Sequence, residues 1–494
     1  MITREQITET LESIALLLEL KGENPFKVRA YRTGAEIVEN SPEDILALAT
    51  GEDASGLEAL KGIGSALALK LHELATTGKL DYYEKLRAEF PDDIFELFAI
   101  QGLGPKKIKA LYEQLGVNSA ASLKRALESG AVSKLPGFGA KSSEKILAAI
   151  AFRESNAEFF RAGEVAAPAQ EILAYLRQLP EVSRAESAGS QRRAKEIVHD
   201  LDFLVASNKP ARVMEHFLSM PAVLDVINRG ETKSSIHLEN GLQCDLRVVS
   251  NAEYPCALCY FTGSVEHNVA MRSRALKRGF TLNEYSLSPL EGSDAEAPAI
   301  EQEADLYRAL DLDFVEPELR ENLGEIEAAE AGELPVLVEL SNLRGTFHCH
   351  TTASDGKNSL REMAEAALEL GLQYLGIADH SVSSFQANGL DEARLRTQMG
   401  EIDDLNKEFK SEFRLFSGTE CDILKDGSLD FEDELLDELD YVVASVHSSF
   451  TLSESAMTAR IIKAIENPRV TMLGHLTGRL LLSRDPYALN IPAV

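Results

Sequence analysis

The sequence has no long apolar run, few cysteines and few prolines, and each of these features excludes a class of protein. No window approaches 18 consecutive apolar residues, so neither a membrane span nor a secretory signal is expected. Five cysteines in 494 residues do not make a disulfide framework, which favours a reducing cytoplasm. With 17 prolines and 44% apolar residues the chain is expected to be globular, and its length predicts several domains.

Positive charge is also scarce overall, because 50 Lys and Arg stand against 80 Asp and Glu. The deficit is uneven, however. Residues 1–290 hold 34 Lys and Arg against 39 Asp and Glu, whereas residues 291–494 hold 16 against 41. The first part therefore has enough cations to contact a phosphate backbone. The composition excludes a histone-like DNA wrapper but permits an enzyme that acts on DNA.

An apolar-x-Gly-x-Gly motif occurs three times within the helical pattern of residues 1–160. The copies are LKGIGSALALKL at 60–71, IQGLGPKKIKAL at 100–111 and LPGFGAKSSEKI at 135–146. Such glycines let a backbone approach phosphate closely, and the N–H groups of the helix that follows favour an anion. The alternative is ordinary helix packing, but three copies favour binding to DNA through its sugar-phosphate path. The expected DNA contacts are Gly62, Gly64, Gly102, Gly104, Lys106, Gly137, Gly139 and Lys141.

The next part of the chain alternates apolar strands with helical stretches. IVHDLDFLVA at 197–206 and LQCDLRVVS at 242–250 are expected strands of an α+β sheet. Asp200 and Asp202 should point to the same face of their strand, so their carboxylates can share two divalent cations roughly 3.5–4 Å apart. Asp245 on the second strand is the expected third ligand.

A Gly189-Ser190 turn followed by Arg192 and Arg193 precedes these strands and offers donors for a triphosphate. A lone Asp-x-Asp motif is often only a pair of surface residues. Together with this turn and with the aspartate on the later strand, it becomes a specific signal for a metal and nucleotide site. Together these residues resemble the family X DNA polymerases, of which eukaryotic polymerase beta is a small member. The segment CYFTGSVEHNVAMRSRALKRGFTLNEYSLSPL (259–290) is similar to the thumb region of that family over its whole length.

The resemblance implies a polymerase active site. The three aspartates would hold two Mg²⁺ or Mn²⁺ ions, and a primer 3′-hydroxyl would attack the α-phosphate of a dNTP in line. Ser190 and Arg193 would bind the triphosphate. Tyr260 and Phe261 would form a wall that rejects a ribose 2′-hydroxyl. The nucleotide contacts that the resemblance implies are Gly189, Ser190, Arg193, Tyr260, Phe261, Gly263, Asn268 and Arg272.

Two features leave alternatives open. The family often has glycine where this chain has Ala194 and His199, so the imidazole beside Asp200 could reshape the phosphate pocket. In polymerase beta-like relatives a lysine after the first hairpin forms a Schiff base with an abasic sugar, and Lys70 matches it. The alternative for Lys70 is a solvated helix lysine, and Ala66 replaces a lysine that the relatives use for phosphate.

The last part of the chain alternates short strands with helices and places histidines at strand ends, in RGTFHCH, GIADH, ASVH and LGH. Imidazoles that converge from several strand ends, together with carboxylates, suit a cluster of Zn²⁺ or Mn²⁺. Asp379 is expected to orient the ring of His380. The expected ligands are His348, His350, Asp355, His380, Glu420, His447 and His475.

These histidine motifs resemble the polymerase-and-histidinol-phosphatase (PHP) domain that bacterial family X polymerases carry C-terminally. The resemblance implies phosphoester hydrolysis, as a 3′→5′ exonuclease or in cleavage at abasic sites. In the family the domain continues to a final strand and an Asp-x-His metal pair, which do not follow LLSRDPYALNIPAV here. The PHP domain is therefore expected to lack its last part.

The sequence thus predicts a multidomain α+β protein: a gap-filling repair polymerase, monomeric and cytoplasmic, that binds gapped or nicked DNA and dNTPs without a membrane. The alternatives are a catalytically weakened DNA scaffold and a PHP-type phosphatase. The expected domains are a helical lyase-like region at 1–85, a fingers-like region with two hairpins at 86–160, a nucleotidyltransferase palm at 161–250, a thumb at 251–320, an acidic linker at 321–335 and a barrel-like PHP domain at 336–494.

Overall fold

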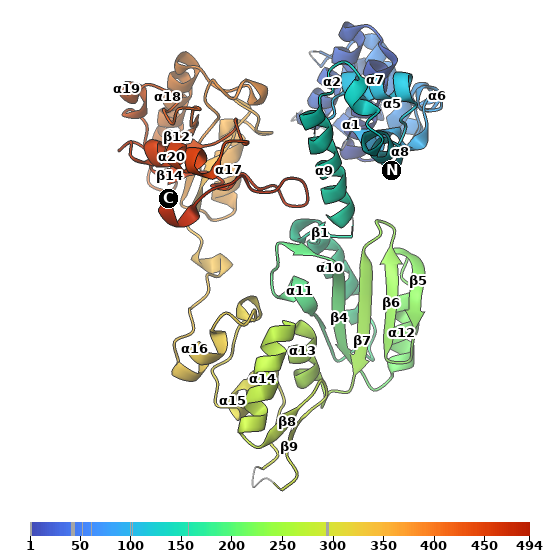
Figure 1. Cartoon of the computed structure of the whole chain (residues 1–494), viewed down its shortest axis with the longest axis vertical. Coiled ribbons are helices and arrows are strands. Elements are labelled where there is room, and N and C mark those ends of the chain that lie inside the picture. The colour runs from blue at the N-terminus through green and yellow to red at the C-terminus, as the bar shows by residue number, and fades with distance from the viewer. Residues whose placement is uncertain are drawn as a thin grey trace. The chain divides into compact units, whose positions relative to one another are not determined.

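The computed structural model describes residues 2–40, 45–51, 53–60, 62–98, 100, 102–156, 158–292 and 296–494. Internal contacts divide the chain into two units: residues 155–343 with 479–486 form one, and the remainder forms the other. The expected multidomain α+β fold is confirmed, with an N-terminal helical region, a mixed central sheet and a C-terminal parallel sheet (Figure 1). No helix in these ranges is long and apolar enough to cross a membrane.

The N-terminal region consists of helices packed around one apolar core. A Thr3–Gln6 capping box begins the first helix, and the apolar stripe of that helix is fully buried. The elements are α1 (Arg4–Lys21), α2 (Pro25–Asn40), α3 (Ile45–Ala49), α4 (Ser55–Glu58), α5 (Ser65–Thr77), α6 (Asp81–Arg87), η1 (Asp92–Leu97), α7 (Pro105–Leu115), α8 (Ala120–Glu128), η2 (Val132–Lys134) and α9 (Ala140–Asn156).

The three glycine pairs form the same turn, each before a helix. The first glycines, Gly62, Gly102 and Gly137, have φ of +105°, +89° and +85°, a left-handed backbone that residues with a side chain rarely adopt. At the second glycine of each pair an added Cβ would meet nothing within 4 Å. Protein packing therefore leaves the second position open, and an external group can approach the backbone there.

The central sheet has the strand order β2-β4-β7-β6-β5, in which β4 and β7 run parallel and the other neighbours antiparallel. Helices α10 and α12 cover one face, and α13 of the following region covers part of the other. The elements are β1 (Phe160–Arg161), α10 (Ala162–Arg177), β2 (Arg184–Ser187), α11 (Gly189–Arg192), β3 (Ile197–Val198), β4 (Asp200–Ala206), α12 (Pro210–Leu218), β5 (Val223–Arg229), β6 (Lys233–Leu238) and β7 (Gln243–Val249).

The thumb-like region follows the sheet and has its own core. Its elements are α13 (Tyr254–Thr262), α14 (Val265–Lys277), β8 (Phe280–Leu282), β9 (Leu287–Pro289), α15 (Glu303–Ala309), η3 (Pro317–Leu319) and α16 (Glu325–Ala331), and η4 (Leu340–Asn342) comes after it. Ile326 and Ala329 of α16 belong to this core. The segment 321–335, expected to be a linker, therefore contains a packed helix; its acidic composition hid a short apolar face.

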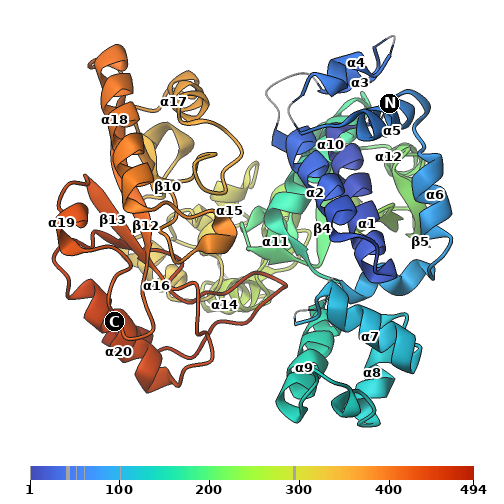
Figure 2. The ribbon, with the colours of Figure 1, turned by 90° about the horizontal axis from the view of Figure 1, so that it is seen from above.

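The C-terminal region is built on five parallel strands in sequential order, β10 to β14. Helices α17, α18 and α20 lie around these strands (Figure 2), as expected for consecutive βα units. The elements are β10 (Gly345–Cys349), α17 (Leu360–Glu369), β11 (Tyr374–Ile377), η5 (Phe385–Ala387), α18 (Glu392–Phe409), β12 (Arg414–Asp422), α19 (Asp433–Leu436), β13 (Tyr441–Ser445), α20 (Glu454–Ile465), β14 (Met472–Leu473) and η6 (Ile491–Ala493).

A buried arginine ties the thumb-like region together. Arg320 is fully buried between the rings of Tyr307 and Phe314, with its guanidinium carbon 5.2 Å from each ring centroid. Its Nη1 donates to Glu303 at 2.5 Å, and Nε donates to the carbonyl of Val315 at 2.9 Å. Glu303 is 7% exposed, and the cations beside it, Arg320 foremost, outweigh burial and lower its pKa.

Replacing Arg320 by Met should destabilise the protein by about 3 kcal/mol, because Glu303 loses a buried counter-charge. The matched control is Arg308→Met, since Arg308 is exposed and its pair with Asp305 should be worth less than about 1 kcal/mol. Urea unfolding of the full chain, followed by circular dichroism, measures both. Equal midpoints for the two variants would contradict this assignment.

Candidate active sites

The central sheet brings three carboxylates together on one face. Alternation along β4 and β7 sends the odd residues of β4 and the even residues of β7 into the core beneath α10 and α12. Asp200 and Asp202 therefore lie on the opposite face. Because β4 and β7 are parallel, with Asp202 directly beside Asp245, all three side chains share that face at one end of the strands.

The electrostatics of this cluster favour a divalent cation. Burial, followed by repulsion from Asp200 and Asp245, raises the pKa of Asp202 to about 7. Asp245 differs, because hydrogen bonds from Lys233, Gln243 and Ser235 outweigh its burial and lower its pKa. Lys233 Nζ lies 2.9 Å from Asp245 Oδ2. Clustered carboxylate oxygens are the ligands that Mg²⁺ and Mn²⁺ prefer, so the donor set fits such ions.

The Gly-Ser turn packs directly against these carboxylates. Gly189 begins α11 with φ +59°, and a Cβ added there would lie 2.1 Å from Asp202 Oδ2. Only glycine permits this approach of α11 to β4. The turn thereby places Arg193 next to the acidic cluster, where its positive charge partly counteracts the rise in the pKa of Asp202 that burial causes. Ser190 follows Gly189 in α11.

The end of α13 meets the same turn. Tyr260 and Phe261 pack edge to face with ring centroids 5.2 Å apart, and the guanidinium of Arg247 lies 4.6 Å from the Phe261 ring centroid. Asn268 Nδ2 donates to the carbonyl of Tyr260 at 2.7 Å. Gly263 lies against Arg193, whose Nη1 would be 3.0 Å from an added Cβ.

The remaining implied nucleotide contact, Arg272, lies on the exposed surface of α14, where its Nε donates to the Asn268 carbonyl. The structure thus gathers Gly189, Arg193, Tyr260, Gly263 and Asn268 around one corner. The sequence motifs did not indicate that Lys233 and Arg247 would lie at this site.

His199 has contacts with Glu158, Phe159 and Asp200. Its Nε2 lies 3.1 Å from Glu158 Oε2, and its ring packs edge-on against Phe159 at 5.6 Å. Its Nδ1 is 3.9 Å from Asp200 Oδ2. The imidazole is therefore accommodated beside the sheet.

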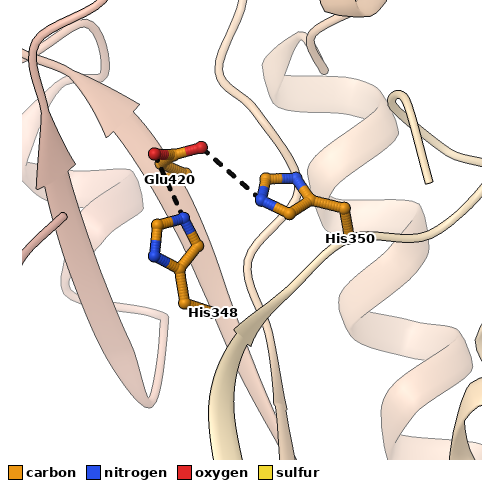
Figure 3. Close-up of side chains that lie close together, drawn as sticks. All are labelled: His348, His350 and Glu420. Carbon is orange, nitrogen blue, oxygen red and sulfur yellow. Dashed lines mark ion pairs between the residues drawn. The ribbon is translucent and has the colours of Figure 1, made fainter. Parts of the chain in front are cut away.

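The C-terminal sheet holds a second cluster, centred on Glu420 (Figure 3). Glu420 is 1% exposed, and its carboxylate lies between His348, at 3.1 Å, and His350, at 3.5 Å. Three further imidazoles complete the contacts: His475 at 2.8 Å, His380 at 3.0 Å and His447 at 3.3 Å. The hydrogen bonds from these histidines outweigh burial and hold the pKa of Glu420 far below its usual range.

Asp355 completes the predicted set, since its two oxygens lie 3.5 Å from His350 Nδ1 and 3.5 Å from His380 Nε2. The ligand atoms form three overlapping groups of three, each spanning less than 4.8 Å: His348 with His350 and Glu420, His350 with Asp355 and His380, and His380 with Glu420 and His447. All seven predicted residues therefore meet. Mixed imidazole and carboxylate ligands suit Zn²⁺ or Mn²⁺.

The sequence motifs did not predict one acidic residue of the Glu420 cluster. Asp422 is buried on the same strand face as Glu420, and its Oδ1 lies 3.0 Å from His447 Nδ1. Despite burial, the hydrogen bonds from Asp422 and Glu420 raise the pKa of His447 to about 9. The i, i+2 spacing of the two acids on one strand was the available signal.

The expectation for Asp379 was wrong. Its buried carboxylate accepts hydrogen bonds from the backbone and hydroxyl of Thr351, at 2.8 and 2.7 Å, and from Ser354 and Gln398. It therefore orders the loop that carries Asp355 and does not contact the His380 ring. The adjacent sequence position suggested a contact that the strand geometry does not make, because neighbouring residues point to opposite faces.

Comparison with known proteins covers the whole chain. The DNA polymerase/3′-5′ exonuclease PolX of Bacillus subtilis (strain 168) is 40% identical over 490 residues, which are 99% of this chain and 84% of that protein. The chain belongs to the family X DNA polymerases that carry a PHP domain. The family models for the DNA polymerase beta thumb and the PHP domain match residues 257–321 and 346–480 of this family X polymerase.

Other relatives match parts of this family X polymerase. Rat DNA polymerase lambda is 25% identical over 344 residues, 64% of this chain and 56% of that protein. A probable phosphatase of Caldicellulosiruptor saccharolyticus is 32% identical over 133 residues, 26% of this chain and 52% of its own length. A helix-hairpin-helix domain matches residues 2–80, and a helix-hairpin-helix tandem matches 94–151.

In the first of these helical regions the polymerase carries an aromatic lysine cluster. Lys70 Nζ lies 4.9 Å from the ring centroid of Tyr82 and 5.8 Å from that of Tyr31, and the two rings stack at 6.0 Å. Burial, followed by repulsion from Lys27, lowers the pKa of Lys70. The lysine is thus neither fully solvated nor ion-paired among the described residues. Tyr82 was not recognised in the sequence, since it comes from a separate helix.

Gly189→Ala should reduce nucleotide incorporation by about 100-fold or more, because the methyl group would displace the Asp202 carboxylate or α11. Gly163→Ala is the matched control, since a Cβ there would meet nothing within 4 Å. Single-nucleotide insertion into gapped DNA, with circular dichroism to verify folding, measures the effect. Full activity of a folded Gly189→Ala protein would refute the close packing of the turn.

Proposed function

We propose that this chain fills short gaps in DNA during repair, and that Asp200, Asp202 and Asp245 hold the two catalytic Mg²⁺ or Mn²⁺ ions. The observation that carries the proposal is the parallel register that sets Asp202 beside Asp245, with the Gly189 turn packed upon them. The family relationship supports DNA polymerisation as the reaction. The particular ions and residue roles are part of the proposal.

Each group of residues at this site has its own role in nucleotide transfer. Ser190 and Arg193 bind the triphosphate, and the Tyr260–Phe261 wall excludes a ribose. The three carboxylates fix the positions at which primer and nucleotide meet. Divalent cations held there would supply charge neutralisation and would lower the pKa of the primer 3′-hydroxyl. That hydroxyl attacks the α-phosphate in line, loses its proton and displaces pyrophosphate.

The Glu420 cluster serves a second reaction, in which a phosphodiester at a DNA 3′ end or an abasic site is hydrolysed. His348, His350, Asp355, His380, Glu420, His447 and His475 would hold Zn²⁺ or Mn²⁺, with Asp422 orienting His447. Metal ions held there would activate a water molecule for attack on the phosphorus and would neutralise charge on the phosphate oxygens. The name of the Bacillus subtilis relative, a DNA polymerase/3′-5′ exonuclease, supports this assignment.

The helical hairpins dock the enzyme on DNA. Their second glycines are open to solvent, and Lys106 and Lys141 are exposed beside them, so phosphate can reach the backbone N–H groups. Gapped or nicked DNA and dNTPs are the proposed partners. A monomeric state and a cytoplasmic location remain predictions.

Neither alternative function accounts for the whole molecule. A weakened scaffold would require His199 to fill the phosphate side of the turn, whereas its ring lies against Glu158 and Phe159. A phosphatase that acts through the Glu420 cluster alone would not explain the cluster of Asp200, Asp202 and Asp245 or the glycine hairpins.

Single substitutions should abolish one of the two reactions and leave the other intact. On a one-nucleotide gap with Mg²⁺ or Mn²⁺, Asp200→Ala should reduce nucleotide insertion on the order of 1,000-fold and leave 3′-end hydrolysis intact. Glu420→Gln should do the reverse with Mn²⁺, because the cluster loses its central anion. Primer extension and 3′-end degradation of labelled DNA measure both. If wild type and Asp200→Ala extend equally poorly, the polymerase assignment fails.

The Lys70 cluster favours one further activity, the cleavage of an abasic sugar through a Schiff base. A lysine with a lowered pKa has more of the neutral amine that such chemistry needs. Borohydride should trap a covalent complex between the enzyme and DNA with an incised abasic site. Lys70→Ala should abolish the complex, whereas Lys79→Ala, which changes an exposed lysine of the same region, should not. Trapping that survives in Lys70→Ala would exclude Lys70 as the nucleophile.

A further inference from the structure

The guanidinium of Arg193 is held by two groups outside its own turn. Its Nε donates to Glu321 Oε1 at 2.9 Å, and its Nη1 donates to the carbonyl of Thr262 at 2.5 Å. The side chain of Arg193 is only 14% exposed. For Nη2, the part of the chain that the structure describes provides no hydrogen-bond partner. The protein thus fixes Nε and Nη1 of the guanidinium, whereas Nη2 is available to bind a ligand.

Glu321 comes from the thumb-like region, directly after the buried Arg320. Its carboxylate also lies 3.4 Å from Lys195 Nζ, so it contacts two cations of the segment that follows the Gly-Ser turn. Lys195 offsets the negative charge of Glu321, which reduces its repulsion of a bound phosphate. The side chain of Glu321 is 24% exposed, so solvent also screens its charge.

We propose that Glu321 is a positioning residue for the incoming nucleotide: it holds Nε of Arg193 so that the Nη2 end is presented to the triphosphate. This inference rests on the proposed role of Arg193. A free arginine side chain loses much rotamer freedom when it binds, and a fork held in advance loses less. Glu321 therefore favours nucleotide binding although it carries the same sign of charge as the nucleotide.

Positioning and competition predict opposite changes in KM. If Glu321 positions Arg193, Glu321→Ala should raise KM for the dNTP about tenfold, because the arginine must be ordered during binding, with a smaller change in kcat. Glu321→Gln keeps an oxygen acceptor for Nε and should raise KM less. If Glu321 instead competed with the triphosphate, both variants would lower KM, and the proposal would be overturned.

Steady-state insertion into one-nucleotide-gapped DNA by the full chain measures these constants, and gel-shift measurement of the Kd for the same DNA should show no change. Glu318→Ala is the matched control, since Glu318 is an exposed acid two residues from Arg320 for which no ion pair is found within the described ranges. It should leave KM as in wild type.

A double-mutant cycle separates positioning from a general loss of packing. If Glu321 acts through Arg193, Glu321→Ala should add little to the KM of Arg193→Met. Independent, multiplicative effects would refute the coupling. Failure of wild-type insertion would instead refute the proposed function, whereas wild-type insertion with an unchanged KM in Glu321→Ala would overturn this inference alone.

Discussion

The close approach of like charges on β4 and β7 is the constraint around which the polymerase region is built. Asp202 stands beside Asp245 in the parallel register, and burial with this repulsion raises the pKa of Asp202 to about 7. The opposite faces of both strands are packed with apolar side chains, which fix the strands despite the repulsion. Lys233 and Arg193 offset part of the charge, and bound divalent cations would offset the rest.

The C-terminal site also brings titratable groups close together, but there most of the groups are bases. One buried carboxylate, Glu420, lies at the centre of five imidazoles, and Asp355 and Asp422 contact some of the same rings from outside. Imidazole is a ligand for softer ions than the carboxylate cluster selects. The two sites can therefore prefer different metals within one chain, although each is assembled at the end of a parallel strand pair.

Functional groups whose position follows from local geometry could be predicted from the sequence. The glycine hairpins and the Asp-x-Asp strand belong to this class, because a required positive φ or period-2 alternation fixes their geometry. The histidines come from distant segments, but their shared place at the ends of strands predicted that they would converge. Contacts between distant segments that no motif marks could not be predicted. Glu321 reaches Arg193 across 128 positions, and Tyr82 reaches Lys70 from another helix. For Asp379, sequence adjacency misled, since its partners come from the loop at 351–354 and from α18.

The contacts of α13 show that the proposed nucleotide site depends on the thumb-like region as well as on the sheet. Thr262, the last residue of α13, accepts hydrogen bonds from Arg192 through its hydroxyl and from Arg193 through its carbonyl. The same two arginines are bound by Glu303 and Glu321. Tyr260 and Phe261 lie within one turn of Thr262, so a shift of α13 must move their rings together with the two arginines. If Arg193 binds the triphosphate and the two rings exclude a ribose, as proposed, selection against a ribose and capture of the triphosphate are mechanically linked.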